Sequence, residues 1–398
     1  MTTATQAPAD AKGHLDPASS LRGAVPVQTR SERPSSFDPA DFGAPTGREV
    51  NWKHTPMDRL APLLRDEPAD DGAVTVTVAS AGAAVSRDLA EGVAPRGTVL
   101  IPEDLPSAVA SRRVPRADHV RIPAGTELAE PVVVDVVGAD AAARAAMHLV
   151  VEAEPNSRAT VLLRHHGRAA LTQNVEIVVR DGAALTLVTV QQWDDDAVHA
   201  SAHAARVDKD AALTHIVVSF GGGLVRVNPS VELAGPGAQG NLYGLSFADA
   251  GQHLESQVYL HHKGPHTTGD VLYKGALQGA GARSVWIGDV LIGPDAVGTD
   301  SYEANRNLVL TDGARADSVP NLEIETGDIA GAGHASATGR FDDEQLFYLQ
   351  ARGIAEDEAR RMVVLGFLTE IVQKIGIAEL ADELTAAIVA ELAEGASA

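Results

Sequence analysis

Hydrophobic and polar residues change their spacing twice along this chain, and the changes divide it into three regions. Between about residues 73 and 330, short apolar runs alternate with polar residues at a period of two, which is typical of half-buried β-strands. After about residue 342 the apolar spacing becomes the 3.6-residue period of α-helices. Before about residue 73, apolar anchors are scattered among prolines and polar residues. The clearest predicted strands are residues 74–78, 132–134, 148–151, 175–179, 185–190 and 215–220.

Turn signals separate the predicted strands, and several of them are alike. No helical stretch of about 12 residues interrupts the region, which argues against βαβ crossovers. Two all-β folds remain: a sandwich of antiparallel hairpins, or a β-helix of stacked coils. Asn-Gly hairpin turns are few, and small residues suit stacked coils, but the pattern alone does not choose between these folds. The similar turns, a glycine or aspartate followed by alanine at a spacing of roughly 25 to 45 residues, include 181–183, 210–212, 237–239, 281–282 and 312–314.

Three helices are predicted in the C-terminal region. The first covers about residues 342–352, where Asp342 and Gln345 have the spacing of a capping box and Gly353 suits a left-handed C-cap. The second covers about 355–374 and begins with acidic residues that complement the helix dipole, and the third covers about 377–394. Because three helices have a limited core of their own, some of their apolar side chains are expected to face outward.

The composition excludes several classes of function. The 398 residues contain no cysteine, so disulfides, thiolate metal sites and cysteine nucleophiles of this chain are impossible. A net charge of −22 argues against binding to nucleic acid or to anionic membranes, which requires clustered lysine and arginine. The N-terminus lacks the apolar segment of a secretory signal, and no apolar run approaches about 18 residues. We therefore expect a cytoplasmic protein with no membrane span.

Clusters of histidine and aspartate give the first candidate metal sites. The densest is HHKGPH at residues 261–266, whose spacing fits a loop; ordinary hydrogen-bonded histidines explain such a group more simply than a metal does. The histidines at 165–166 would point to opposite faces of a strand. Three aspartates at 194–196 either attract calcium or are simply solvated. Asn305 and Asn307 fit a structural amide ladder within a coil.

His334 differs from the other histidines because small residues precede it. It follows Gly331, Ala332 and Gly333, so no large sequence neighbour crowds its ring, and it lies where the strand-rich region is expected to give way to helices. The simpler interpretation is a histidine that hydrogen-bonds this junction to the domain beneath it. The functional interpretation is a neutral imidazole that ligates iron or relays a proton. The residues alone favour the simpler one.

Three segments have distinctive sequence motifs: PTGREVNWKHTPMDRL at residues 45–60, HHKGPHTTGDVLYKGAL at 261–277, and the long stretch from Asn305 to Ile354 that ends in HASATGRFDDEQLFYLQARGI. Together they resemble the SufB/SufD family, the scaffold subunits of an iron–sulfur cluster assembly machine. The absence of cysteine makes the chain resemble SufD more than SufB. Many SufD-like sequences have a cysteine where this chain has Ala332, so any thiolate must come from a partner.

The resemblance implies a fold and a set of partners. The fold is mainly β, with a flexible N-terminus (1–35), an N-terminal helical segment (36–72), a right-handed parallel β-helix core (73–335) and a C-terminal helical domain (336–398). SufD pairs with SufB through the cores, and each binds one SufC, an ABC-type ATPase, through its C-terminal helices. The chain would then be a non-catalytic scaffold of the SUF complex that holds no cofactor alone and meets ATP only through SufC.

The same resemblance implies site residues. His334 would face SufB across the interface where a transient iron–sulfur cluster is assembled, so it is the candidate metal residue. For the apolar docking candidates an ordinary core position is at least as good an explanation, whereas exposed tyrosine and arginine are better interface candidates. The isolated chain is also a candidate homodimer. The residues implied in docking SufC are Phe347, Tyr348, Leu349, Arg352, Gly353, Met362 and Phe367.

Two other functions stay open at this point. A β-helix polysaccharide lyase or hydrolase would need a groove with clustered carboxylates and a basic residue, and the sequence shows no convincing acid pair. A purely structural β-solenoid would need neither the helical flanks nor the specific C-terminal motif. Two further classes are excluded, because the chain has no GxxxxGK(S/T) loop for ATP and no GxSxG nucleophile elbow.

Overall fold

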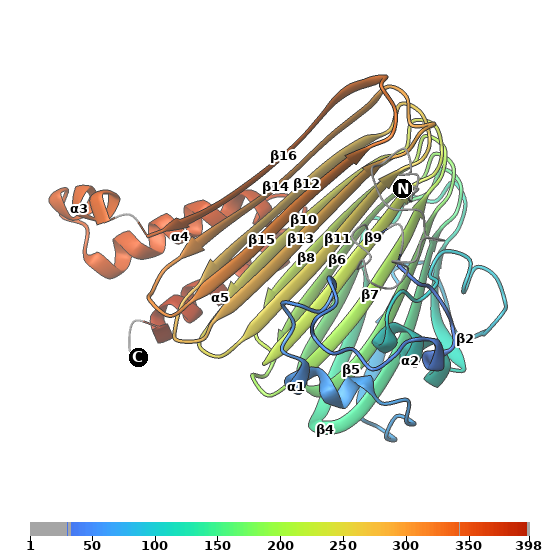
Figure 1. The fold of residues 1–398 in the computed structure, drawn as a ribbon, viewed down its shortest axis with the longest axis horizontal. Coiled ribbons are helices and arrows are strands. Elements are labelled where there is room, and N and C mark those ends of the chain that lie inside the picture. The colour runs from blue at the N-terminus through green and yellow to red at the C-terminus, as the bar shows by residue number, and fades with distance from the viewer. Residues whose placement is uncertain (1–29, 31–32, 342, 396–398) are drawn as a thin grey trace, which may run out of the picture.

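The computed structural model describes residues 30, 33–341 and 343–395, and strands dominate it (Figure 1). Short helical elements precede the strands, one helix interrupts them near the start, and three helices follow them. The strands are β1 Val74–Ala79, β2 Ala84–Ala90, β3 Arg116–Ile122, β4 Val132–Ala153, β5 Arg158–Val179, β6 Ala184–Trp193, β7 Val198–Val207, β8 Ala212–Phe220, β9 Leu224–Leu233, β10 Gln239–Ala248, β11 His253–His262, β12 Thr268–Leu277, β13 Arg283–Ile292, β14 Thr299–Val309, β15 Arg315–Ile324 and β16 Ile329–Arg340. The helical elements are the 3-10 helices η2 Pro39–Asp41 and η3 Ala61–Leu64 and the α-helices α1 Met57–Leu60, α2 Leu105–Arg113, α3 Asp343–Ala351, α4 Glu356–Val372 and α5 Ala378–Gly395.

The strands form one continuous 16-stranded sheet that is folded into two faces. From β6 onward each strand pairs in parallel with the strand two places later, and the long β5 turns the corner by pairing with β6 through 158–167 and with β7 through 170–179. Strands β6, β8, β10, β12, β14 and β16 make the even-strand face, and β7, β9, β11, β13 and β15 make the odd-strand face. The fold is therefore a parallel β-helix, as the family resemblance predicted, and not a sandwich of hairpins. At its start, β1 pairs antiparallel with β4 and β2 with β3.

One corner of this solenoid is a column of residues with left-handed backbone conformation. In each coil the backbone N–H of the corner residue donates to a carbonyl of the next coil, as from Gly182 to Lys209 (2.9 Å) and from Gly237 to Pro265 (3.0 Å). Three of the predicted turns are such corners, because glycine, asparagine and aspartate accept positive φ more readily than most residues. The column contains Asn156, Gly182, Asp210, Gly237, His266 and Gly298, with φ from +52° to +71°.

Aliphatic side chains that point inward from the two faces make the main core. Because the coils are in register, equivalent positions lie one above the other, as Ala159, Leu185 and Leu213 do. Strands only about 4.8 Å apart bring such side chains into direct contact, and residues of moderate size suit this spacing. The abundance of alanine and valine and the scarcity of aromatic residues follow from this stacked interior.

The C-terminal helices α4 and α5 cover the outer side of the even-strand face. Val364 and Leu368 of α4 and Leu384 of α5 are fully buried in one apolar cluster with Phe220 and Phe247 of the sheet. Helix α3 instead projects away from the solenoid (Figure 1). All three helices agree with the predicted bounds to within two residues.

The end of α3 has the predicted left-handed cap, because Gly353 has φ +87° and its N–H donates to the carbonyl of Gln350 (2.9 Å). Asp342, on which the predicted capping box depends, lies outside the described residues. Among the described helices, none combines the length and the apolar character that crossing a membrane requires.

The N-terminal segment and α2 lie on the odd-strand face (Figure 1). Trp52, Leu60 and Leu63 are buried there against Ala200 and Leu224. The short helices of this segment were predicted, whereas α2 was not. The predicted flexible N-terminus, residues 1–35, falls almost entirely outside the described residues.

Candidate functional site

The C-terminal end of the solenoid is open, because within the described chain its last two strands each pair on one side only. Strand β16 pairs with β14, and β15 pairs with β13. Residues 334–340 of β16 are all exposed. An exposed strand edge offers a row of N–H and C=O groups to which a strand of another chain can pair. This open end is the first candidate site.

His334 lies inside strand β16 and not at the strand-to-helix junction where the sequence analysis placed it. The strand continues to Arg340, past the expected domain boundary at residue 335. The sheet register sets His334 beside Glu303 of β14, with 3.8 Å between Nδ1 and Oε1. The His334 side chain is 45% exposed and that of Glu303 only 1%. The imidazole thus stands at the mouth of the open end, with a buried carboxyl group directly beneath it.

Glu303 is the candidate residue that the sequence analysis missed. Neither oxygen of its carboxyl group makes a hydrogen bond of normal geometry, although the backbone of Asn321 is close by. Burial, reinforced by the negative charge of Asp289, raises the pKa of Glu303 to about 8. The only signal in the sequence is its position, since it alternates with Ser301 and Asn305 on the inward side of a strand.

Polar side chains continue along the same interior row. Asn307 donates to Asn305 (2.6 Å), Ser318 donates to the same Asn305 oxygen (2.7 Å), and Ser336 donates to Ser318 (2.8 Å). The two asparagines lie along one strand, and their amides bond to each other within a single coil. Their row connects β14, β15 and β16 beside the open end.

The other histidines and aspartates of the sequence analysis are dispersed. His262 is buried between two hydroxyl groups, while His266 is an exposed corner residue. His165 is buried inside the solenoid and His166 points outward, as expected for neighbours on a strand. Asp196 forms an ion pair with an arginine. In the described part of the chain, no three histidine or acidic side chains come together as metal ligands would.

Most of the predicted docking residues are exposed on α3 and α4. Phe347, Tyr348 and Met362 are 71%, 56% and 47% exposed, which is unusual for side chains of this size. The guanidinium of Arg352 lies over the Tyr348 ring at 4.6 Å from its centre, and Gly353 is exposed at the helix end. All of them are exposed; Met362 lies on α4, and the others lie on or just after the projecting helix α3 (Figure 1).

Leu349 and Phe367 differ from that group because both are half-buried. The Phe367 ring lies 4.9 Å from the Lys274 ammonium of β12, and the same ammonium donates to the Phe367 carbonyl (2.8 Å) and pairs with Glu370 (2.6 Å). Phe367 therefore helps to attach α4 to the sheet.

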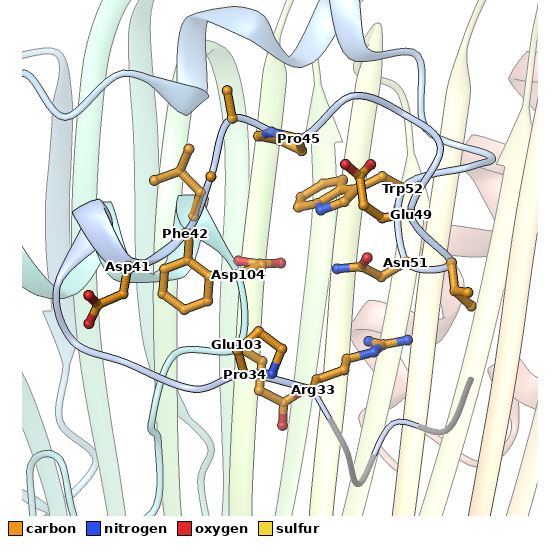
Figure 2. A pocket seen from close by; sticks show the side chains of 14 residues that line it. Arg33, Pro34, Asp41, Phe42, Pro45, Glu49, Asn51, Trp52, Glu103 and Asp104 are labelled. Atoms are coloured by element: carbon orange, nitrogen blue, oxygen red, sulfur yellow. The ribbon is translucent and has the colours of Figure 1, made fainter. Parts of the chain in front are cut away.

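A cavity of about 350 Å³ lies beneath the N-terminal segment (Figure 2). Phe42 and Trp52 line it together with the carboxylates of Glu49 and Asp104. Asp104 caps α2 and pairs with Arg226 (2.8 Å), and Glu49 accepts bonds from the backbone of its own loop. Because these carboxylates are engaged within the fold, we assign the cavity to the attachment of the N-terminal segment.

The fold and the open end define a class of protein: a β-helix body with an unpaired strand edge at its C-terminal end and a helical region that follows it. The family model described as "SUF system FeS cluster assembly, SufBD core domain" matches residues 136–367, more than half of the chain. The chain belongs to this SufBD family of iron–sulfur cluster assembly proteins.

Similar proteins occur in mycobacteria. An iron–sulfur cluster assembly SufBD family protein of Mycobacterium tuberculosis is 48% identical over 372 residues, which cover 92% of this chain and 94% of that protein. One of the same description from Mycobacterium leprae is 46% identical over 364 residues, covering 90% and 93%. A second SufBD family protein of the same M. tuberculosis strain is 30% identical over 201 residues, covering 50% of this chain and 24% of that protein. That strain therefore has at least two members of the family, which differ in their identity to this chain.

Proposed function

We propose that this chain is the SufD-type, non-catalytic scaffold subunit of a cytoplasmic SUF iron–sulfur cluster assembly complex. The observation that carries the proposal is the open end of the solenoid, with His334 at its mouth and no thiolate anywhere in the chain. Membership of the SufBD family favours this role over a polysaccharide-cleaving β-helix or a purely structural solenoid.

The proposed partner at the open end is SufB. The unpaired edges of β15 and β16 suit strand pairing with a second β-helix, and the two SufBD family members of one M. tuberculosis strain fit a heterodimer of related chains. A cysteine-bearing partner would supply the thiolates that this chain lacks. His334 would then ligate iron or relay a proton while a cluster, which is cargo and not a resident cofactor, forms between the chains.

The proposed partner of the helical region is the ATPase SufC, which would supply all ATP chemistry. Phe347, Tyr348, Arg352 and Met362 are exposed, Arg352 lies over the Tyr348 ring, and large aromatic and arginine side chains are the residues that most often dominate interface energetics. The apolar cluster that attaches α4 and α5 to the sheet links such a docking surface to the solenoid.

Co-purification of the three proteins tests the docking surface. Tyr348→Ala and Arg352→Glu are expected to lose SufC while they keep SufB. The matched control is Arg48→Glu, the same charge reversal at an exposed arginine of the N-terminal segment, which is expected to leave the complex intact. Retention of SufC by both helix variants would contradict docking through α3.

Cluster formation by the assembled complex tests His334. His334→Ala is expected to preserve the complex and to reduce the rate of cluster formation. His166→Ala is the control, because the His166 side chain has nearly the same exposure, 47% against 45%. An unchanged rate in His334→Ala would rule out the proposed role of this histidine.

A homodimer of the isolated chain that excludes SufB would argue against the heterodimer.

A further inference from the structure

The carboxyl group of Glu303 has no counter-charge within hydrogen-bonding distance, although it is almost completely buried. A buried carboxyl group without a counter-charge is held neutral, and a cation bound beside it would supply the counter-charge that its carboxylate form lacks. The fold makes room for the Glu303 carboxyl group, because a side chain at Gly288 would collide with both this carboxyl group and the Trp286 ring. The position of this carboxyl group is therefore built into the packing of the last coils.

The geometry of Glu303 and His334 suits two ligands of one ion. They occupy equivalent positions on adjacent strands, so both side chains point into the end of the solenoid. Two ligands at about 2.1 Å from one ion lie about 3.0 to 3.4 Å apart in octahedral or tetrahedral arrangements. The observed separation of 3.8 Å between Nδ1 and Oε1 is only slightly wider, and a small side-chain rotation closes it.

A second acidic group lies near this place, and Arg30 and Arg33 lie close enough to it to offset part of its charge. Asp289 lies close enough to Glu303 to act on it electrostatically, and one of its own carboxylate oxygens also lacks a hydrogen bond. Imidazole and carboxylate together suit first-row divalent ions such as Fe²⁺, whereas softer thiolate ligands are absent from the chain.

We infer that Glu303 and His334 form a two-ligand half-site for Fe²⁺ at the open end, completed by water in the isolated chain and by groups of the partner in the complex. The inference rests on the proposed function and extends it, because it adds a carboxylate ligand and assigns weak iron binding to this chain alone.

Anaerobic equilibrium dialysis of the full-length chain against Fe²⁺ tests the half-site. The wild type is expected to bind about one ion, and Glu303→Gln and His334→Ala are each expected to weaken binding tenfold or more, on the order of losses seen when metal sites lose a supporting group. Asp300→Asn, which removes an exposed carboxylate from the same strand, is the matched control and should bind as the wild type does. Loss of the free-ion electron paramagnetic resonance signal of Mn²⁺ provides a second readout.

A second variant separates loss of a ligand from loss of the fold. Glu303→Met removes the carboxyl group and keeps a side chain of similar length near the Trp286 ring, and thermal unfolding verifies that each variant is folded. If folded Glu303 variants bind both ions as the wild type does, the inference is overturned, even where His334→Ala abolishes cluster formation and the proposed function stands. Weakened binding in the Glu303 variants together with normal cluster formation in His334→Ala supports the half-site and contradicts the proposed role of His334 in assembly.

Discussion

Arg226 joins parts of the chain that are far apart in sequence. Its guanidinium, on β9, donates to Asp104 (2.8 Å) and Glu255 (3.0 Å) and lies over the Trp52 ring at 4.1 Å. Glu255 also accepts from Thr55 (2.8 Å). Because the Arg226 guanidinium and the Glu255 carboxylate are both buried, removing the guanidinium leaves the carboxylate without its arginine counter-charge. This one arginine thus attaches the N-terminal segment to the odd-strand face.

Arg226→Met is expected to lower the free energy of unfolding by about 3 to 5 kcal/mol, the usual cost of breaking a buried ion pair. Urea unfolding, followed by tryptophan fluorescence, measures the change. The control is Arg206→Met, since Arg206 pairs with acidic side chains while 48% exposed, and a loss of less than about 1 kcal/mol is expected there. Equal losses in the two variants would show that the buried network has no special weight.

Histidines inside the solenoid make stability depend on pH. Burial lowers the pKa of His165 and of His215 to about 4, below the value of 6.5 for an unperturbed histidine. The unfolded state therefore binds more protons between these pH values, so stability is complete above about pH 6.5 and is lost as the pH falls toward 4. Protonation of each histidine is expected to make the free energy of unfolding about 1 kcal/mol lower at pH 5.5 than at pH 7.5.

His215→Gln tests this dependence. Between pH 7.5 and pH 5.5, the free energy of unfolding measured in urea should fall by about 1 kcal/mol more in the wild type than in the variant. The comparison uses the variant because Glu303 acts in the opposite direction: its raised pKa makes the folded state bind the extra proton, so its contribution improves as the pH falls. A difference between the two proteins that is constant over this pH range would contradict the buried, neutral state of His215.

At the residue scale, the sequence predicted His334 as a candidate but not its partner. His334 was recognisable from its small neighbours and from the family motif around it. Glu303 lies 31 positions earlier, and only the register of β14 against β16 brings the two side chains together. Such a pairing depends on non-local hydrogen bonds, which a single sequence does not encode in any short motif.

Among the elements, the corner column offers the sharpest test of the coil geometry. Gly237 has φ +71°, and a Cβ there would meet the Asp210 carboxylate of the neighbouring coil. Gly237→Ala is therefore expected to lower the free energy of unfolding by about 1 to 2 kcal/mol. Asp210→Gly, at the equivalent corner, relieves the strain of a non-glycine residue at φ +52° and should change stability by less than about 1 kcal/mol. Thermal or urea unfolding compares the two, and the reverse order would exclude this account of the corners.

The elements that the sequence predicted well are those set by local signals. The C-terminal helices have clear periodicity and acidic first turns, and their bounds were predicted closely. Strand β16 was not recognised beyond residue 335, because its glycine, alanine and serine residues have little β-propensity and it forms by pairing with β14. Helix α2 was missed because nearly all of its residues are buried, so it shows no amphipathic pattern.

In the whole molecule, the chain's own segments pack on both faces of the solenoid, whereas within the described residues no further strand pairs with its C-terminal end. The N-terminal segment packs on the odd-strand face and α4 with α5 on the even-strand face. What is left for a partner is the edge of β15 and β16 and the projecting α3 (Figure 1).

Ala337→Arg places a charge on the exposed edge strand. The isolated variant should keep its stability to within about 0.5 kcal/mol, as most surface substitutions do, but it should lose association with SufB if the edge is the interface. Ala142→Arg, at an exposed alanine of β4, should keep that association. Size-exclusion chromatography of the mixed proteins distinguishes the results, and normal assembly by Ala337→Arg would move the interface elsewhere.

The continuity of the hydrogen-bonded sheet has a mechanical consequence. Lys274 attaches α4 to β12. Only β14 lies between β12 and the edge strand β16, and it pairs with both of them along its length. A close-packed sheet of this kind is expected to move as a rigid body, because a close-packed interior transmits strain. If an attached protein tilts the helices, the open end formed by β15 and β16 is therefore expected to move as one unit. His334 and Glu303 would then keep their positions relative to each other.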